Sequence, residues 1–251
     1  MPLATCSVVA VIPARMGSSR FPGKPIARLL GRPMIEHVYR RVSMSTAVAA
    51  TYVATCDEEI RAVAEGFGAP VIMTSSAHER ASDRVAEAAR HVDADIVVLV
   101  QGDEPMTVPG MIDAGVAPML ADPSIACVNL AGRITTETEW NDPNTIKVVM
   151  DLRGNALSFS RQPIPTVFKQ VCVIPFRRAA LFDYAALAPT PLEIAESIDM
   201  MRFLEHGRAV RMVEIDVASQ AVDTEADRRR VEALLRKDPL TRTYLAAGVG
   251  A

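Results

Sequence analysis

The chain has 251 residues, of which 49% are hydrophobic and 23% charged, and its formal net charge is −3. This composition excludes an intrinsically disordered chain, and the small net charge excludes a general binder of nucleic acid. No apolar run approaches the roughly 18–20 residues of a membrane span. We therefore expect a cytoplasmic protein with a single domain over residues 1–251 and with no nucleic-acid or membrane partner.

Strands and helices are expected to alternate along the N-terminal part of the chain. Short apolar runs predict buried strands at 6–12, 49–54, 70–73 and 96–100. Helical patterns lie between them at 34–42, at 57–65 and from 82 or 83 to 91. This alternation predicts an α/β fold with a mostly parallel central sheet and helices on both of its faces.

The alternation loosens after residue 105. We expect helices at 109–120, 191–206 and 224–235, strands at 125–130, 171–175 and 210–217, and a polar loop at 137–144. Two further strands, 146–150 and 156–159, flank the turn D-L-R-G-N and predict a hairpin. The middle third of the chain is therefore expected to be an antiparallel elaboration of the core.

Three loops are expected at the carboxyl ends of the parallel strands, where open α/β sheets bind their ligands. These loops are 13–25, the turn at 56–57, and 101–105. Residues 13–41 contain seven basic residues and one acidic residue. A local excess of positive charge in a nearly neutral protein indicates a small anionic ligand.

The spacing of the first loop excludes two common phosphate-binding motifs. Five residues separate Gly17 from Gly23, and Pro25 stands where a Walker A loop needs Ser or Thr. The G-x-G-x-x-G of dinucleotide folds is also absent. The pattern P-A-R-x-x-S-x-R-x-P-G-K-P suits a nucleoside triphosphate, because Arg15 and Arg20 can clamp phosphate oxygens and Lys24 adds a mobile positive charge.

Two carboxylates are candidates for a magnesium site. Asp103 directly follows the most apolar strand, at the expected ligand edge, and Mg²⁺ prefers one or two carboxylates together with phosphates and waters. Asp223 follows the last strand and is a candidate second ligand, although a helix N-cap explains it at least as well. We expect Mg²⁺ as the cofactor.

Several motifs together resemble those of the CMP-Kdo synthetase family, the 3-deoxy-manno-octulosonate (Kdo) cytidylyltransferases. They are the P-A-R-x-x-S-x-R-x-P-G-K-P loop, G-R-P-M-I-x-H-V, Q-G-D-E-P, N-x-x-x-x-K-V-V-x-D-x-x-G-x-A-L-x-F-S-R and V-D-T. The resemblance covers nearly the whole chain. It implies a Rossmann-like nucleotidyltransferase fold, a homodimer, and Mg²⁺-dependent transfer of CMP from CTP with release of pyrophosphate.

The resemblance and the motifs give three sets of expected site residues besides the metal ligands Asp103 and Asp223. The expected catalytic residues are Arg15, Lys24, Lys147 and Arg161. The expected nucleotide-binding residues are Pro13, Ala14, Arg15, Ser18, Arg20, Lys24, Thr55, Ser82, Arg84 and Gln101. The expected acceptor-binding residues are Gln101, Arg161, Gln170, Asp199 and Arg202.

The sequence departs from the family at the base and acceptor sides. The family's S-G-T-E-R turn is here R-A-S-D-R, which introduces Arg80. The family's H-x-G-I-Y-G-Y-R segment is 170–177 here, with Gln170 at the His position and Ile174 at the Tyr position. Loss of hydrogen-bonding partners weakens discrimination for a hydroxylated substrate. We therefore expect a small anionic acceptor, a phosphonate such as phosphonoformate.

Alternatives to this interpretation remain open. The departures are also compatible with a Kdo enzyme or with an enzyme for a related sugar acid. A nucleotidyltransferase that uses another base is a further reading, and so is a non-catalytic nucleotide-binding protein on the same fold. The presence of both Lys24 and Asp103 argues against the non-catalytic reading.

Overall fold

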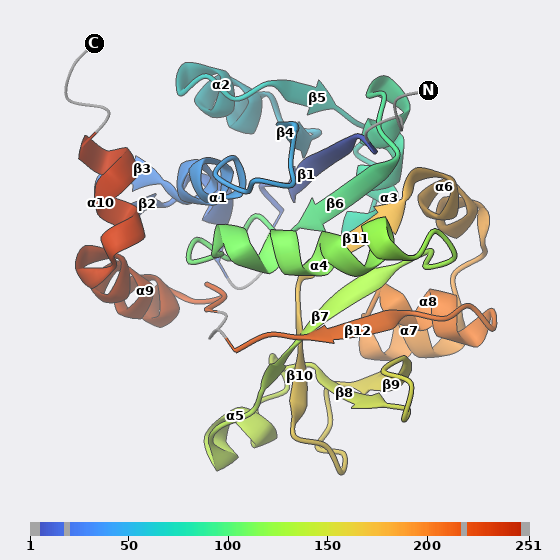
Figure 1. Cartoon of the computed structure of the whole chain (residues 1–251). Coiled ribbons are helices and arrows are strands. Elements are labelled where there is room, and N and C mark those ends of the chain that lie inside the picture. Colours follow the sequence, from blue (N-terminus) through green and yellow to red (C-terminus); the bar gives the residue numbers. More distant parts are fainter. Residues whose placement is uncertain (1–5, 18–20, 217–219, 247–251) are drawn as a thin grey trace.

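The central sheet is built from the apolar runs of the N-terminal part. The computed structural model describes residues 6–17, 21–216 and 220–246. One sheet has the order β11-β6-β1-β4-β5 (Figure 1). Its strands are β1 (Val8–Ala14), β4 (Ala50–Thr55), β5 (Val71–Met73), β6 (Ile96–Val100) and β11 (Val173–Arg177). Only β11 runs antiparallel to its neighbour, so the expected mostly parallel sheet is confirmed.

Helices cover both faces of this sheet, because successive side chains of a strand point to opposite faces. Val8, Ala10 and Ile12 belong to one core cluster and Val9 and Val11 to another. The first cluster includes residues of α1 (Met34–Val42), α2 (Glu58–Gly66) and α4 (Pro109–Ala121). The second includes residues of α3 (Ala81–Ala88), α6 (Arg178–Ala186) and α8 (Met200–Glu205).

Strand β1 continues two residues beyond its expected end. Its pairing with β6 stops at Val11, whereas its pairing with β4 continues to Ala14. At Pro13 the strand therefore has only one strand partner, which makes the missing N–H of proline tolerable. The extension carries Pro13 and Ala14 to the carboxyl edge of the sheet.

A second sheet lies below the first in Figure 1, with the order β12-β7-β10-β8-β9. Its strands are β7 (Val128–Arg133), β8 (Lys147–Met150), β9 (Ala156–Ser160), β10 (Phe168–Val171) and β12 (Arg211–Glu214). All of its pairs are antiparallel except β12 with β7. The hairpin β8–β9 is as expected, with the Asp151 carboxylate accepting from the Asn155 amide across the turn.

Four sequence expectations need correction. Residues 171–175 are not one strand, because the chain passes from the second sheet to the first at Cys172. The polar loop contains a short helix, α5 (Glu137–Asn141), capped by the Thr136 hydroxyl. The stretch 191–206 is two helices, α7 (Pro191–Glu196) and α8, separated at Ser197. Helices α6 and α10 (Pro239–Ala246) were not expected.

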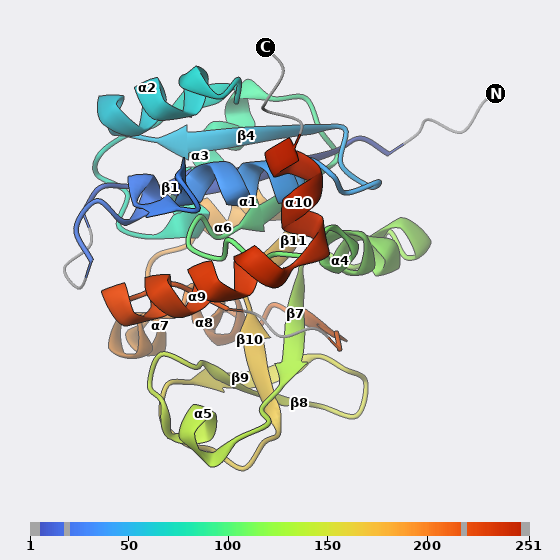
Figure 2. The ribbon, with the colours of Figure 1, turned by 90° about the vertical axis from the view of Figure 1, so that its left-hand side faces the viewer.

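The C-terminal helices α9 (Glu225–Lys237) and α10 return to the N-terminal part of the chain (Figure 2). Tyr244 of α10 bonds through its hydroxyl to His37 Nδ1 at 2.7 Å, and His37 Nε2 lies 2.8 Å from the Leu29 carbonyl. Arg41 pairs with Asp238, between the two C-terminal helices. Leu29 belongs to the small β2–β3 hairpin (Arg28–Leu29 and Arg32–Pro33), which follows η1 (Lys24–Ile26). The C-terminal helices are therefore fastened close to the Lys24 loop.

Within the described parts of the chain, no helix combines the length and the apolar character that crossing a bilayer requires.

Candidate functional site

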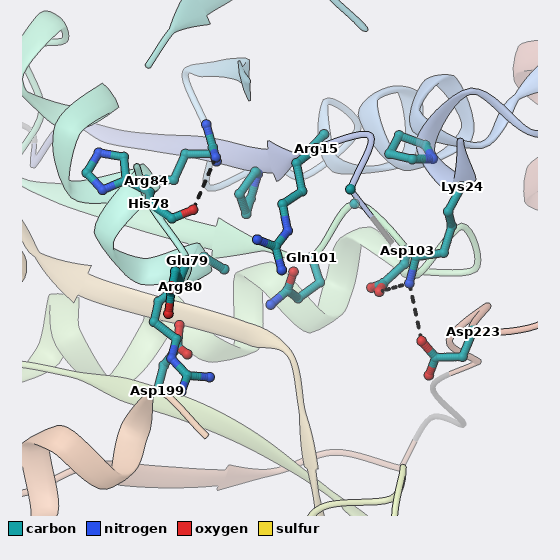
Figure 3. Close-up of a pocket in the computed structure, with 16 residues that line it drawn as sticks. Arg15, Lys24, His78, Glu79, Arg80, Arg84, Gln101, Asp103, Asp199 and Asp223 are labelled. Atoms are coloured by element: carbon teal, nitrogen blue, oxygen red, sulfur yellow. Dashed lines mark hydrogen bonds and ion pairs between the residues drawn. The ribbon is translucent and has the colours of Figure 1, made fainter. Parts of the chain in front are cut away.

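A cavity of about 540 Å³ opens at the carboxyl ends of β1 and β6 (Figure 3). The loops after these strands supply one side of it, and the first turn of α3 supplies another. Its lining includes the expected residues Pro13, Ala14, Arg15, Lys24, Arg84, Gln101, Asp103, Asp199 and Asp223. The structure thus brings together residues from five separate segments of the sequence.

Lys24 lies at the meeting point of three of these segments. Gly23, with φ +70°, allows the tight turn that begins η1. The Lys24 ammonium lies 2.6 Å from Asp103 Oδ2 and 3.2 Å from Asp223 Oδ1, and Figure 3 shows both contacts. Burial opposes the charged form, but the two carboxylates outweigh it and raise the pKa of Lys24 above its ordinary value.

The loop after β6 packs tightly against β1. A Cβ atom at Gly102 would come within 3.0 Å of the Pro13 carbonyl and 3.2 Å of the Ile35 side chain. Only glycine therefore lets Gln101 and Asp103 reach the cavity from this position. The Asp103 carbonyl accepts from the Val222 amide at 2.9 Å, which ties the segment before α9 to the same loop.

The loop after β1 is anchored by the turn after β4. Asp57 occupies the N-cap position of α2, but its carboxylate accepts from the Met16 amide at 2.8 Å rather than capping the helix. Arg15 is exposed and lines the cavity. Ser18 and Arg20 lie outside the described residues.

The first turn of α3 supplies the wall of the first cavity that lies opposite loop 13–25. Arg84 is buried, with its guanidinium bonded to the Thr74 hydroxyl and to the carbonyls of Ser75 and His78. The buried Ser82 donates its amide to Asp199 Oδ2 at 3.0 Å. Burial raises the pKa of the Asp199 carboxyl above its usual value.

A second cavity, of about 630 Å³, adjoins the first and shares with it Gln101, Asp103, Asp199 and Asp223. Arg161, Lys169 and Gln170 also line it. Because the two cavities share these four residues, two ligands bound side by side would meet at Asp103 and Asp223.

Arg161 follows β9; its backbone amide donates to the Glu196 carboxylate at 2.8 Å, and among the described residues its guanidinium bonds to main-chain carbonyls. Its guanidinium donates to Glu196 at 2.6 Å, to Pro143 at 3.0 Å and to Ser197 at 3.2 Å. No carboxylate of the described residues forms an ion pair with it, whereas Lys169 in the same cavity is paired with Glu139. The guanidinium of Arg161 therefore brings to the second cavity a positive charge that no ion pair of the described residues neutralises.

The comparisons with known proteins agree on one family. The cytidylyltransferase family profile matches residues 9–215. The 3-deoxy-manno-octulosonate cytidylyltransferase of Geobacter metallireducens is 42% identical over 243 residues, which are 89% of this chain and 96% of the relative. The chain belongs to this family of cytidylyltransferases. The enzyme of the same name from Syntrophotalea carbinolica is 43% identical over 247 residues, covering 92% of this chain and 99% of the relative.

Solved structures place this cytidylyltransferase in the same fold. A CMP:2-keto-3-deoxy-manno-octonic acid synthetase complexed with CTP superposes with a TM-score of 0.86, at 38% identity, covering 92% of this chain and 99% of that chain. A 4-diphosphocytidyl-2C-methyl-D-erythritol synthase from Anaerococcus prevotii superposes with a TM-score of 0.65 at 13% identity, covering 92% of this chain and 99% of that chain. The second likeness shows the shared fold alone.

Four expected site residues, Thr55, Ser82, Lys147 and Arg202, lie elsewhere in the cytidylyltransferase and line neither cavity. Arg202 is buried on α8, paired with Glu193 and Asp83 and stacked on Tyr184, so its charge is already neutralised. Lys147 is buried and donates to the carbonyls of Asp142 and Arg161, and burial lowers its pKa.

Thr55 is also buried, and its hydroxyl accepts from the Asp57 amide. Ser82 is buried as well, and its backbone amide donates to Asp199. All four residues therefore support the walls of the site rather than line it.

Asp103 and Asp223 fit the expected magnesium ion by their chemistry. Their carboxylates converge on one cation, the Lys24 ammonium. The described residues contain no cluster of three or more His, Cys, Asp or Glu side chains arranged for a metal. A divalent ion here would need phosphate and water oxygens to complete its shell, which is how Mg²⁺ is usually held.

The sequence reasoning missed Asn129, which holds Gln170 in place. Asn129 is buried on β7, donates to the Val171 carbonyl at 2.8 Å and accepts from the Gln170 amide at 2.6 Å. Its signal in the sequence is a lone amide within an apolar strand. The break between α7 and α8 at Ser197 had no such signal, because a serine within a helical pattern does not predict a break.

Proposed function

We propose that this cytidylyltransferase transfers CMP from CTP to Kdo and releases pyrophosphate. The observation that carries the proposal is the match to 3-deoxy-manno-octulosonate cytidylyltransferases at 42% and 43% identity over 89% and 92% of the chain. Matches of this length include the segments that form both cavities.

Kdo replaces the phosphonate that the altered segment 170–177 suggested. The named relatives favour the sugar acid, and none of those described above is named for a phosphonate. The second cavity, at about 630 Å³, also has the volume typical of sites for ligands larger than phosphonoformate. Gln170, held by Asn129, can still exchange hydrogen bonds with sugar hydroxyls.

The first cavity suits CTP, which the matched synthetase structure contains. In our proposal Arg15 and Lys24, together with Ser18 and Arg20 of the same loop, bind the triphosphate. Their positive charges stabilise the pyrophosphate that leaves when the acceptor oxygen attacks the α-phosphorus. Arg84 and Ser82 shape the wall for the nucleoside.

The second cavity orients the acceptor. Arg161 attracts the Kdo carboxylate, and Gln101 lies between the two ligands, because it lines both cavities. Asp103 and Asp223 would hold Mg²⁺ at the shared edge. When bound, the ion would neutralise phosphate charge and lower the pKa of a coordinated hydroxyl. Most of the catalytic effect of the protein is then placement and charge, with no covalent intermediate.

The proposal is tested by measuring pyrophosphate release from CTP in the presence of Mg²⁺. We expect release only when Kdo is added, with phosphonoformate as the control acceptor and ATP, GTP and UTP as control nucleotides. Turnover with phosphonoformate and none with Kdo would contradict the proposed acceptor. Equal turnover with every nucleotide would contradict the proposed donor.

A further inference from the structure

Ser197 has a backbone conformation that serine rarely adopts. Its φ of 54° and ψ of 49° are left-handed, and among the described residues only one other non-glycine residue, Leu30, has a positive φ. Left-handed geometry is unfavourable for a residue with a Cβ, so the surrounding contacts must hold it. This residue ends α7 and separates it from α8.

Two arginines from distant elements hold Ser197. Arg80, at the start of α3, donates through Nη1 to the Ser197 hydroxyl at 2.6 Å and through Nη2 to the Glu193 carbonyl at 3.3 Å. Arg161 donates to the carbonyls of Ser197 and Glu196. Two arginines from distant parts of the sequence therefore both bond to this segment.

The two arginines line different cavities. Arg80 lines the first cavity, which we propose binds CTP, and Arg161 lines the second cavity, which we propose binds the acceptor. Asp199 lines both cavities and is bonded to the Ser82 amide on α3. Residues 197–199 line the second cavity, and Asp199 also lines the first, so this segment borders the place where the two cavities adjoin. Helix α3 and the residue before it contact the segment through Ser82 and Arg80.

We propose that Arg80 is a positioning residue for the acceptor half of the site. By donating to the Ser197 hydroxyl, Arg80 fixes segment 196–199. This segment contains Asp199, and its carbonyls hold the Arg161 guanidinium. The inference rests on the proposed function for the identity of the acceptor. The turn S-G-T-E-R, which this segment resembles, has serine at position 80. A serine side chain is too short to reach the Ser197 hydroxyl as Arg80 does, so this contact depends on the arginine of this chain.

The kinetic test compares Arg80→Ala and Ser197→Ala with the wild type. Each variant should raise the KM for Kdo about tenfold. Ser197→Ala should leave the KM for CTP nearly unchanged, because Ser197 lines the second cavity and not the first. Arg80 also lies 3.7 Å through Nε from the Glu193 carboxylate. Arg80→Lys should recover part of the loss, because an ammonium keeps the positive charge and can still donate to one of these acceptors. The control is Arg208→Ala, since Arg208 is exposed just beyond α8 and should behave as wild type.

Ser197→Gly separates the hydrogen bond from the backbone shape. Glycine adopts the left-handed conformation easily but lacks the hydroxyl. If the Arg80 bond positions the wall, Ser197→Gly should raise the KM for Kdo as Ser197→Ala does. Kinetics like those of wild type in both Ser197 variants and in Arg80→Ala would overturn the proposal.

A second readout does not depend on turnover. Hydrogen exchange of the amides of residues 193–202 should be faster in Arg80→Ala than in the wild type and the Arg208→Ala control, each saturated with CTP. Unchanged exchange there would overturn the positioning role. Should the wild type fail to use Kdo, the proposed function fails, while the exchange experiment still decides whether Arg80 braces this segment.

Discussion

Lys24 joins three segments that are far apart in the sequence. Its ammonium contacts Asp103 of the loop after β6 and Asp223 of the segment before α9. Its side chain is only 14% exposed, so these contacts form in a partly desolvated place where charges interact strongly. In the proposed reaction the same charge is available to the departing pyrophosphate.

Replacement of Lys24 by alanine should lower kcat about 10²–10³-fold, the usual cost of removing one preorganised electrostatic donor. Lys237→Ala is a matched control, because Lys237 is exposed at the end of α9. Steady-state kinetics with saturating CTP would measure the effect. A Lys24→Ala enzyme with wild-type kcat would contradict the role of this residue.

Arg202 was expected to bind the acceptor, but it is buried and lies outside the lining of the second cavity. Because it is buried and paired with Glu193 and Asp83, Arg202→Ala should leave uncompensated carboxylates in the interior. Breaking such a pair costs about 3–5 kcal/mol of folding stability. Denaturant unfolding should show that loss. Unchanged stability with a raised KM for the acceptor would instead restore the role expected from the sequence.

At the scale of elements, α10 is docked through a buried histidine. Burial lowers the pKa of His37 below 6.5, and the nearby Arg41 cation lowers it further. The unfolded chain therefore binds more protons than the folded protein below pH 6.5. The contribution of His37 to stability is complete above that pH and is lost as the pH falls through it.

The melting temperature of the wild type should consequently fall from pH 7 to pH 5 more steeply than that of His37→Gln. The glutamine variant keeps a polar side chain near Tyr244 and Leu29 but does not titrate in this range. The carboxylates that titrate in both proteins cancel in the comparison. Parallel pH profiles for the two proteins would show that His37 does not couple α10 to pH.

The elements that the sequence predicted well are those governed by one local pattern. Helix α1 and strand β6 have the expected bounds, because each is a short apolar pattern between clear start and stop residues. The sequence could not show that 171–175 changes sheets at Cys172, or that 191–206 breaks at Ser197. Both features depend on tertiary partners, namely two different sheets and two distant arginines.

At the scale of the whole molecule, the lining of the first cavity was largely predictable and that of the second was only partly so. Lys24, Gln101 and Asp103 follow parallel strands, and strand ends meet at one edge of such a sheet. Arg161 and Gln170 line the second cavity, but Arg202 and Lys147 are buried and bonded to other residues of the protein. Basic residues alone do not reveal which of them find an internal partner. The homodimer stays a prediction.

We propose that the enzyme makes CMP-Kdo. Mass spectrometry of the products formed from CTP, Mg²⁺ and an equimolar mixture of Kdo and phosphonoformate can decide between the two acceptors, which compete for one site. The expected product has the mass of CMP-Kdo, with pyrophosphate in equal amount. A CMP adduct of phosphonoformate in its place would show that the proposed acceptor is wrong.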